Sequence, residues 1–184
     1  MSNETVSHKD NRAEDITEFF NSQEQLKDST QRRDYFEHLD ENEFLDLVQQ
    51  TAGLVRTGKV ENQHFDGETV GLMTHEVPDQ REKEQLLRDT WTVAKEFLSD
   101  AEIPDEDALD YAALTVAGGL LYAHPFMDGN GRTSRTLSYM IARGNGDKQE
   151  LHDILAETGG GRNWQVAPVP LVTSGQSVFE GKQP

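Results

Sequence analysis

The residues most able to do chemistry lie within twelve positions, in the segment His124-Pro125-Phe126-Met127-Asp128-Gly129-Asn130-Gly131-Arg132-Thr133-Ser134-Arg135. The unperturbed pKa of an imidazole lies near neutrality, so His124 could accept a proton from a hydroxyl group. Asp128 offers carboxylate oxygens, which suit Mg²⁺ when phosphates supply further ligands. Arg132 and Arg135 are three residues apart, so on a helix they would share a face and could bind phosphate oxygens.

A glycine-bearing loop between two helices must position these groups. Pro125 cannot continue the helix before it, and a new helix is predicted to begin near Gly131. The first N–H groups of a helix have no partner within the helix and form an anion site. Gly129 and Gly131 lack Cβ atoms, so a phosphate could approach the backbone closely, and the Asn130 amide could donate to it. The pattern predicts a phosphate cradle beside a general base.

Each of these residues also has a purely structural interpretation. A single histidine at a helix end often caps the helix, and Gly-Asn-Gly is commonly a turn. The two arginines could pair with the many acids of the chain, and Asp128 could be an N-cap. Phe126 is better interpreted as a core residue that anchors the loop. The functional interpretation therefore depends on the whole set occurring together in this order.

The segment resembles the Fic family motif, His-Pro-Phe-x-(Asp/Glu)-Gly-Asn-Gly-Arg-x-x-Arg, at every fixed position. A pattern of this length is far more specific than an isolated glycine-rich motif. The resemblance extends over about residues 31–157 and is structural outside the motif. It implies an all-α, Fic-type helical domain with a small β-hairpin flap.

The resemblance implies a protein adenylyltransferase that moves AMP from ATP to a Ser, Thr or Tyr hydroxyl of a target protein. It assigns His124 as the general base and Asp128 as the Mg²⁺ ligand acting through the ATP phosphates. It assigns the anion nest to Gly129, Asn130 and Gly131, the β-phosphate clamp to Arg132 and the γ-phosphate contact to Arg135. Asp replaces the commoner Glu at 128, which shortens the reach to the metal.

Two further segments acquire roles by the same resemblance. A target-docking flap is implied for Glu68, Thr69, Val70, Gly71, Leu72, Met73 and Thr74. Many relatives are inhibited by a helix with the pattern Ser/Thr-x-x-x-Glu-Gly/Asn, which Thr57 to Asn62 fits loosely, with Glu61 as the inhibitory residue. Gly58 is a poor helix former, so a separate antitoxin-type inhibitor is the alternative.

Other activities remain open alternatives. Phosphotransferases of the family carry Lys in place of the second motif glycine, and phosphocholine transferases replace the first, so Gly131 and Gly129 favour AMP transfer. A catalytically silent module that binds a nucleotide or a partner would not need His124. A phosphate or metal hydrolase built on His64, His75, His124 and acidic residues lacks the HExxH pattern, and the chain has no Walker A sequence.

Composition limits the partners. The 184-residue chain carries a net charge of −17, which argues against binding to nucleic acid or an anionic membrane. Residues 124–143, with three Arg and one Asp, form a small basic island in this acidic chain. There is no cysteine, and we find no signal peptide or apolar run long enough to span a membrane. The expected location is the cytoplasm, with a secreted effector as the alternative.

The pattern along the chain predicts three regions: an acidic, partly disordered extension over 1–30, the Fic domain over 31–165, and an irregular tail over 166–184. Within 1–30, expected to add little to the core, Ile16, Phe19 and Phe20 have the spacing of a short docking helix. Apolar spacing predicts helices over 31–56, 79–99, 103–124, 131–143 and 147–157, and a β-ribbon over 59–78. Small residues in 103–124 favour a central position for that helix.

Overall fold

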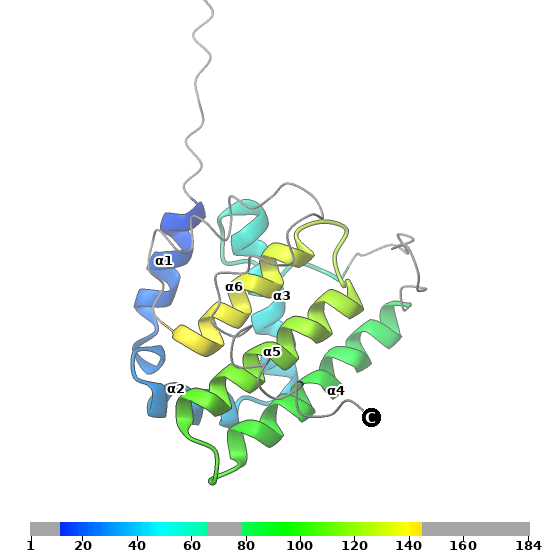
Figure 1. The fold of residues 1–184 in the computed structure, drawn as a ribbon. Helices are drawn as coiled ribbons and strands as arrows, with labels where there is room; N and C mark the ends of the chain where they lie inside the picture. The colour runs from blue at the N-terminus through cyan, green and yellow to red at the C-terminus, as the bar shows by residue number, and fades with distance from the viewer. Residues whose placement is uncertain (1–11, 66–78, 145–184) are drawn as a thin grey trace, which may run out of the picture.

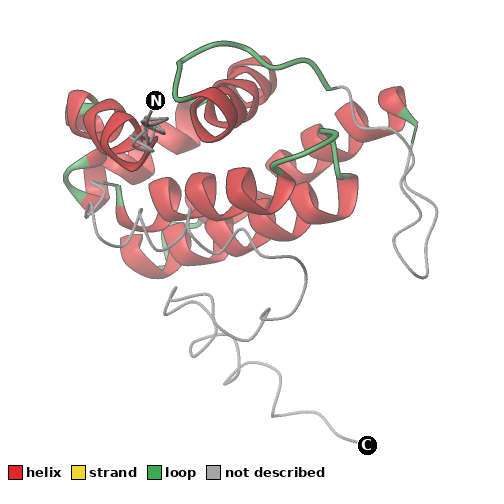
Figure 2. Cartoon of the chain, turned by 90° about the horizontal axis from the view of Figure 1, so that it is seen from above, coloured by secondary structure: helices red, strands yellow, loops and turns green. Residues whose placement is uncertain are grey.

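The computed structural model describes residues 12–65 and 79–144. Its elements are α1 (Arg12–Ser22), the 3-10 turn η1 (Glu24–Leu26), α2 (Ser29–His38), α3 (Glu41–Thr57), α4 (Gln80–Ser99), α5 (Asp105–Ala123) and α6 (Asn130–Arg143). Every element in these two ranges is helical, which confirms the all-α prediction (Figure 2). The flap predicted over Glu68–Thr74, the helix predicted over 147–157 and the tail over 166–184 lie outside the described residues. Among the described helices, none is long and apolar enough to cross a membrane.

Helix α5 lies between α4 and α6, as its small side chains predicted (Figure 1). At Gly119 the helix contacts Thr90 of α4 so closely that an added Cβ would lie 2.8 Å from the Thr90 Cβ. On its other side, the Ser134 hydroxyl of α6 donates to the carbonyl of Ala117 over 3.2 Å. These contacts bring the end of α5 and the start of α6 together at the loop that joins them.

The helix predicted over 31–56 is divided into α2 and α3 by Leu39 and Asp40. Asp40 has an extended backbone, and its carboxylate accepts hydrogen bonds from the N–H groups of Asn42 and Glu43. The Glu43 carboxylate in turn accepts from the Asp40 N–H over 2.8 Å. This reciprocal capping box starts a new helix, and Asp-x-x-Glu was the sequence signal that the count of apolar residues missed.

The expectation that residues 1–30 add little to the core is wrong for their described part. Ile16 and Phe20 of α1 are fully buried and Leu26 of η1 is 1% exposed. Arg32 of α2, 5% exposed, donates to the carbonyls of Leu26, Ile141 and Ala142 over 2.8–3.1 Å. Because the last carbonyls of a helix have no partner within it, this guanidinium joins the N-terminal elements to the end of α6.

An aromatic cluster joins the start of α3 to α4. The rings of Phe44 and Trp91 stack with centroids 4.4 Å apart and planes 5° from parallel. The Trp91 indole donates to the carbonyl of Leu39 over 3.0 Å, so its one polar atom is satisfied although the residue is fully buried. The cluster thereby holds α4 in place against α3.

Candidate active site

The loop of the predicted motif begins where α5 ends. His124 is the C-cap residue, with φ 45° and ψ 56°, and its N–H donates to the carbonyl of Leu120 over 3.0 Å. It is the only non-glycine residue with positive φ in the part of the chain that the structure describes. That conformation costs about 1–2 kcal/mol for a residue with a Cβ, and such strain clusters at functional sites. Pro125 contributes, since the residue before a proline is disfavoured in the right-handed helical region.

Phe126 and Asn130 hold the loop in shape. The ring of Phe126 is fully buried and lies 5.5 Å from that of Phe65, which confirms the predicted anchor. The Asn130 Oδ1 accepts from the Phe126 N–H over 2.9 Å, and its Nδ2 donates to the Phe126 carbonyl over 2.6 Å. Asn130 is 6% exposed, so its amide supports the loop rather than facing a phosphate as the sequence pattern suggested.

The imidazole of His124 is half-buried beside the first residue of α6. The Asn130 Nδ2 lies 3.2 Å from its Nε2 and 3.3 Å from its Nδ1. Burial lowers the pKa of His124 below its ordinary value of 6.5, and the positive charge of Lys83 lowers it further. A histidine with a lowered pKa is neutral at physiological pH, which is the form that accepts a proton.

Both predicted arginines reach the N-terminal turn of α6. The Arg132 Nη2 lies 3.8 Å from where a Cβ on Gly129 would stand, and the Arg135 Nη1 lies 3.4 Å from the same position on Gly131. Arg132 also donates to the Asp128 carboxylate over 2.8 Å. The structure therefore contains the pairing with an acid that the structural interpretation of the arginines suggested. The Arg132 side chain is 15% exposed and that of Asp128 is 77% exposed.

Gly129 is the N-cap of α6, with φ 85°, a conformation that favours glycine. A Cβ there would lie 3.2 Å from the Cγ of Arg56, which belongs to the last turn of α3. Sequence reasoning missed Arg56, and no local signal connects it with a loop more than seventy residues away. Gly131 is open toward the Arg135 guanidinium and leaves the first turn of α6 uncrowded.

Asp128 suits a magnesium ion held mainly through phosphates. Its carboxylate is exposed on the loop, within reach of whatever the first turn of α6 binds. No group of three or more His, Asp or Glu residues that could hold a metal occurs among residues 12–65 and 79–144. Mg²⁺ commonly binds through one or two carboxylates together with substrate phosphates, so this single carboxylate fits that mode.

The inhibitory helix suggested by the pattern from Thr57 to Asn62 is not formed. Helix α3 ends at Thr57, because Gly58 takes the left-handed conformation with φ 73°. The Glu61 carboxylate accepts from the Thr57 hydroxyl over 3.2 Å and from Gln63 over 2.9 Å. Glu61 is therefore placed by an irregular segment and not by a helix that presents it to the motif arginines.

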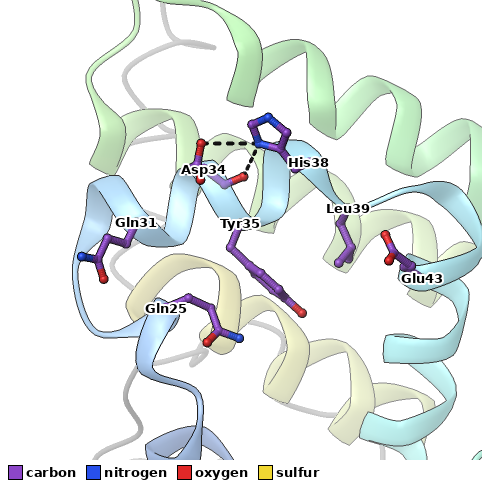
Figure 3. A pocket seen from close by; sticks show the side chains of 7 residues that line it. All are labelled: Gln25, Gln31, Asp34, Tyr35, His38, Leu39 and Glu43. Carbon is purple, nitrogen blue, oxygen red and sulfur yellow. Dashed lines mark hydrogen bonds and ion pairs between the residues drawn. The ribbon is translucent and has the colours of Figure 1, made fainter.

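A hollow of about 480 Å³ lies elsewhere, between η1, α2 and the start of α3 (Figure 3). Most of the residues that line it have polar side chains; Asp34 and His38 are in contact, and the Tyr35 ring lies between Gln25 and Leu39. Burial, and then the charge of Glu43, raise the pKa of Tyr35. No residue of the 124–135 motif lines this hollow, so it is separate from the candidate active site.

The comparisons with known proteins agree with the fold and the loop. The family model of the Fic/DOC family matches residues 37–142, which is more than half of the chain. The chain belongs to the Fic/DOC family, whose members are Fic-fold enzymes that transfer nucleotides or other phosphate-containing groups. Neither the curated proteins nor the solved structures include one that matches the chain.

Proposed function

We propose that the protein is an adenylyltransferase that moves AMP from ATP to a Ser, Thr or Tyr hydroxyl of a target protein. The observation that carries the proposal is the position of the half-buried His124 beside the N-terminal turn of α6, which Arg132 and Arg135 also reach. The lowered pKa of His124 keeps its imidazole a proton acceptor. Gly129 and Gly131 support AMP transfer over the related reactions, because the resemblance associates replacement of either glycine with another transferred group.

In this proposal the triphosphate lies over the first turn of α6, where the backbone N–H groups and both guanidiniums favour anions. The target hydroxyl oxygen attacks the α-phosphorus while its proton passes to the His124 imidazole. The bond from the α-phosphorus to the oxygen that bridges to the β-phosphate breaks, and its electron pair leaves with pyrophosphate. Arg132 and Arg135 stabilise the charge that develops on this leaving group.

Asp128 would hold Mg²⁺ together with the ATP phosphates, and the ion would neutralise charge on the departing pyrophosphate. Arg132 would then exchange the Asp128 carboxylate for a phosphate oxygen, which frees that carboxylate. Asn130 would act through the loop, since its amide bonds to Phe126 fix the backbone that carries the base.

The test supplies the purified protein and a cell lysate with ATP labelled at the α-phosphate or at the γ-phosphate. We expect label in excess of that in the lysate alone only from the α-labelled nucleotide, with its amount rising linearly at early times. General-base catalysis contributes about 10²–10⁴-fold, so His124→Ala should lower the initial rate of this excess labelling by at least that factor. Excess label only from γ-labelled ATP would overturn AMP transfer in favour of phosphate transfer.

His38→Ala is the matched control. His38 is an exposed histidine that contacts Asp34 at the hollow of Figure 3, so its removal should leave the labelling rate unchanged. Equal rates for wild type and His124→Ala, with wild-type stability in both, would show that His124 is not the base.

A further inference from the structure

Helix α4 contributes a buried lysine to the same end of the molecule. Lys83, in the first turn of α4, is 1% exposed and is the only buried lysine in the part of the chain described. Lysine is almost never fully buried without a specific reason, because removing an ammonium from water is costly. Nothing in the roles assigned above uses this charge.

Helix geometry places Lys83 against the end of α5. The contact between Thr90 and Gly119 fixes the register of α4 and α5, which run antiparallel (Figure 1). Lys83 precedes Thr90 by seven residues, which is about two helical turns or about 10 Å on the same face. Beyond Gly119 on the antiparallel partner, α5 continues for only about one more turn, to Ala123, and the loop begins at His124, so Lys83 lies at the level of the start of this loop. The effect of the Lys83 charge on His124 agrees with this placement.

The other charged groups around His124 are already engaged with the loop. On α6, Arg132 pairs with the loop carboxylate of Asp128, and Arg135 extends toward Gly131. On α3, Arg56 packs over Gly129. Among these cations, Lys83 is the one whose charge lowers the pKa of His124.

We propose that Lys83 is a positioning residue that keeps His124 in its proton-accepting form while a triphosphate occupies the site. The inference rests on the proposed function, because it assumes that a polyanion binds at the first turn of α6. Negative charge beside an imidazole stabilises the protonated ring, so the bound substrate would by itself disable its own base. A fixed ammonium behind the ring opposes this effect, and burial keeps the ammonium from being screened by solvent and salt.

The test is an NMR titration of the histidine ring protons in the full chain, in which His124→Gln identifies the His124 signal. We expect Lys83→Met to raise the pKa of His124 and Lys83→Arg to leave it low, because only the first variant removes the positive charge. Lys95→Met is the matched control: its ammonium lies twelve residues further along α4 and donates to the Leu39 carbonyl over 3.2 Å. An unchanged His124 pKa in a folded Lys83→Met protein would overturn the proposal.

A second measurement uses the unmodified protein, in case Lys83→Met does not fold. Saturating Mg²⁺ and inorganic tripolyphosphate should leave the pKa of His124 at or below 6.5, and a rise well above this value would also overturn the proposal. The titration needs no enzymatic activity, so the two proposals fail separately. A raised pKa in Lys83→Met without any AMP transfer by the wild type would refute only the proposed activity.

Discussion

Two adjacent glycines of α5 offer a direct test of how closely this helix packs. Gly118 is exposed, and a Cβ added there would meet no atom within 4 Å, whereas a Cβ on Gly119 would overlap the Oγ1 and Cγ2 atoms of Thr90. Replacing a glycine by alanine inside a helix stabilises it by about 1 kcal/mol. Gly118→Ala should retain this gain, which corresponds to a rise in Tm of about 2–4 °C for a chain of this size.

Gly119→Ala receives the same gain but must make room for a methyl group. Its Cβ would stand 2.8 Å from the Thr90 Cβ, and because ordinary carbon contacts lie at about 3.5–4.0 Å, the helices must part by about 1 Å. Rotation of the Thr90 side chain cannot relieve a contact with its own Cβ. Overpacking of this kind costs about 1–3 kcal/mol, and because both variants receive the helix gain, Gly119→Ala should be about 1–3 kcal/mol less stable than Gly118→Ala.

The assay is urea unfolding followed by far-ultraviolet circular dichroism, comparing midpoints between variants whose slopes are equal. Thr90→Ala in the Gly119→Ala background removes the two overlapping atoms and should recover part of the loss, which a double-mutant cycle quantifies. Equal stability of the two single variants would refute the close contact. It would also contradict the register of α4 and α5 that places Lys83 level with the start of the loop.

Three further predictions concern the loop and the ends of the bundle. Asn130→Ala leaves the buried N–H and carbonyl of Phe126 without their side-chain partner. Thermal unfolding should show a loss of about 1–3 kcal/mol in the free energy of unfolding, and label transfer should also be lost. Wild-type stability would contradict a stabilising role for these two hydrogen bonds. Gly144→Ala should lower the urea midpoint, because its φ is 70° and an added Cβ would overlap the Leu26 carbonyl oxygen; an unchanged midpoint would show that this junction can relax. Hydrogen bonds from Thr30 and Arg33 hold the pKa of Asp105 below its ordinary value of 3.8. The contribution of Asp105 to stability is therefore present above pH 3.8 and is lost as the pH falls through the pKa of the folded state. Between pH 7 and pH 3, wild type should lose more stability than Asp105→Asn, and equal losses would count against the effect.

Local features were readable because they depend on neighbours in the chain. The periodicity of apolar residues predicted α4 closely, and the small side chains of α5 predicted its central place. Pro125 and Gly144 marked ends of elements through their own backbone preferences. The apolar periodicity failed to show that residues 31–56 form two helices. The reciprocal hydrogen bonds of Asp40 and Glu43 start a new helix within a segment whose apolar residues alone suggest one.

The chemistry of the loop was likewise apparent from residue types alone, but its supporting contacts were not. Asn130 seemed a phosphate ligand because its amide stands among phosphate-binding groups, yet the folded loop turns that amide onto the backbone of Phe126. The burial of α1 depends on its packing against α3, which no short window of the sequence contains.

Lys83 shows most clearly which properties follow from the sequence and which require the tertiary structure. It falls on the same stripe as Leu87, Trp91, Ala94 and Leu98, so its spacing alone indicates that α4 carries a charge on its buried face. Which group that charge acts on is decided by the crossing of α4 and α5 at Thr90 and Gly119, which brings Lys83 level with the start of the loop at His124, forty-one residues away in the chain. The sequence by itself determined the reactive groups and the helices that carry them, because both follow from local pattern. Only the tertiary structure decided the electrostatic surroundings of the base, since charges act through space between segments that the chain order keeps apart.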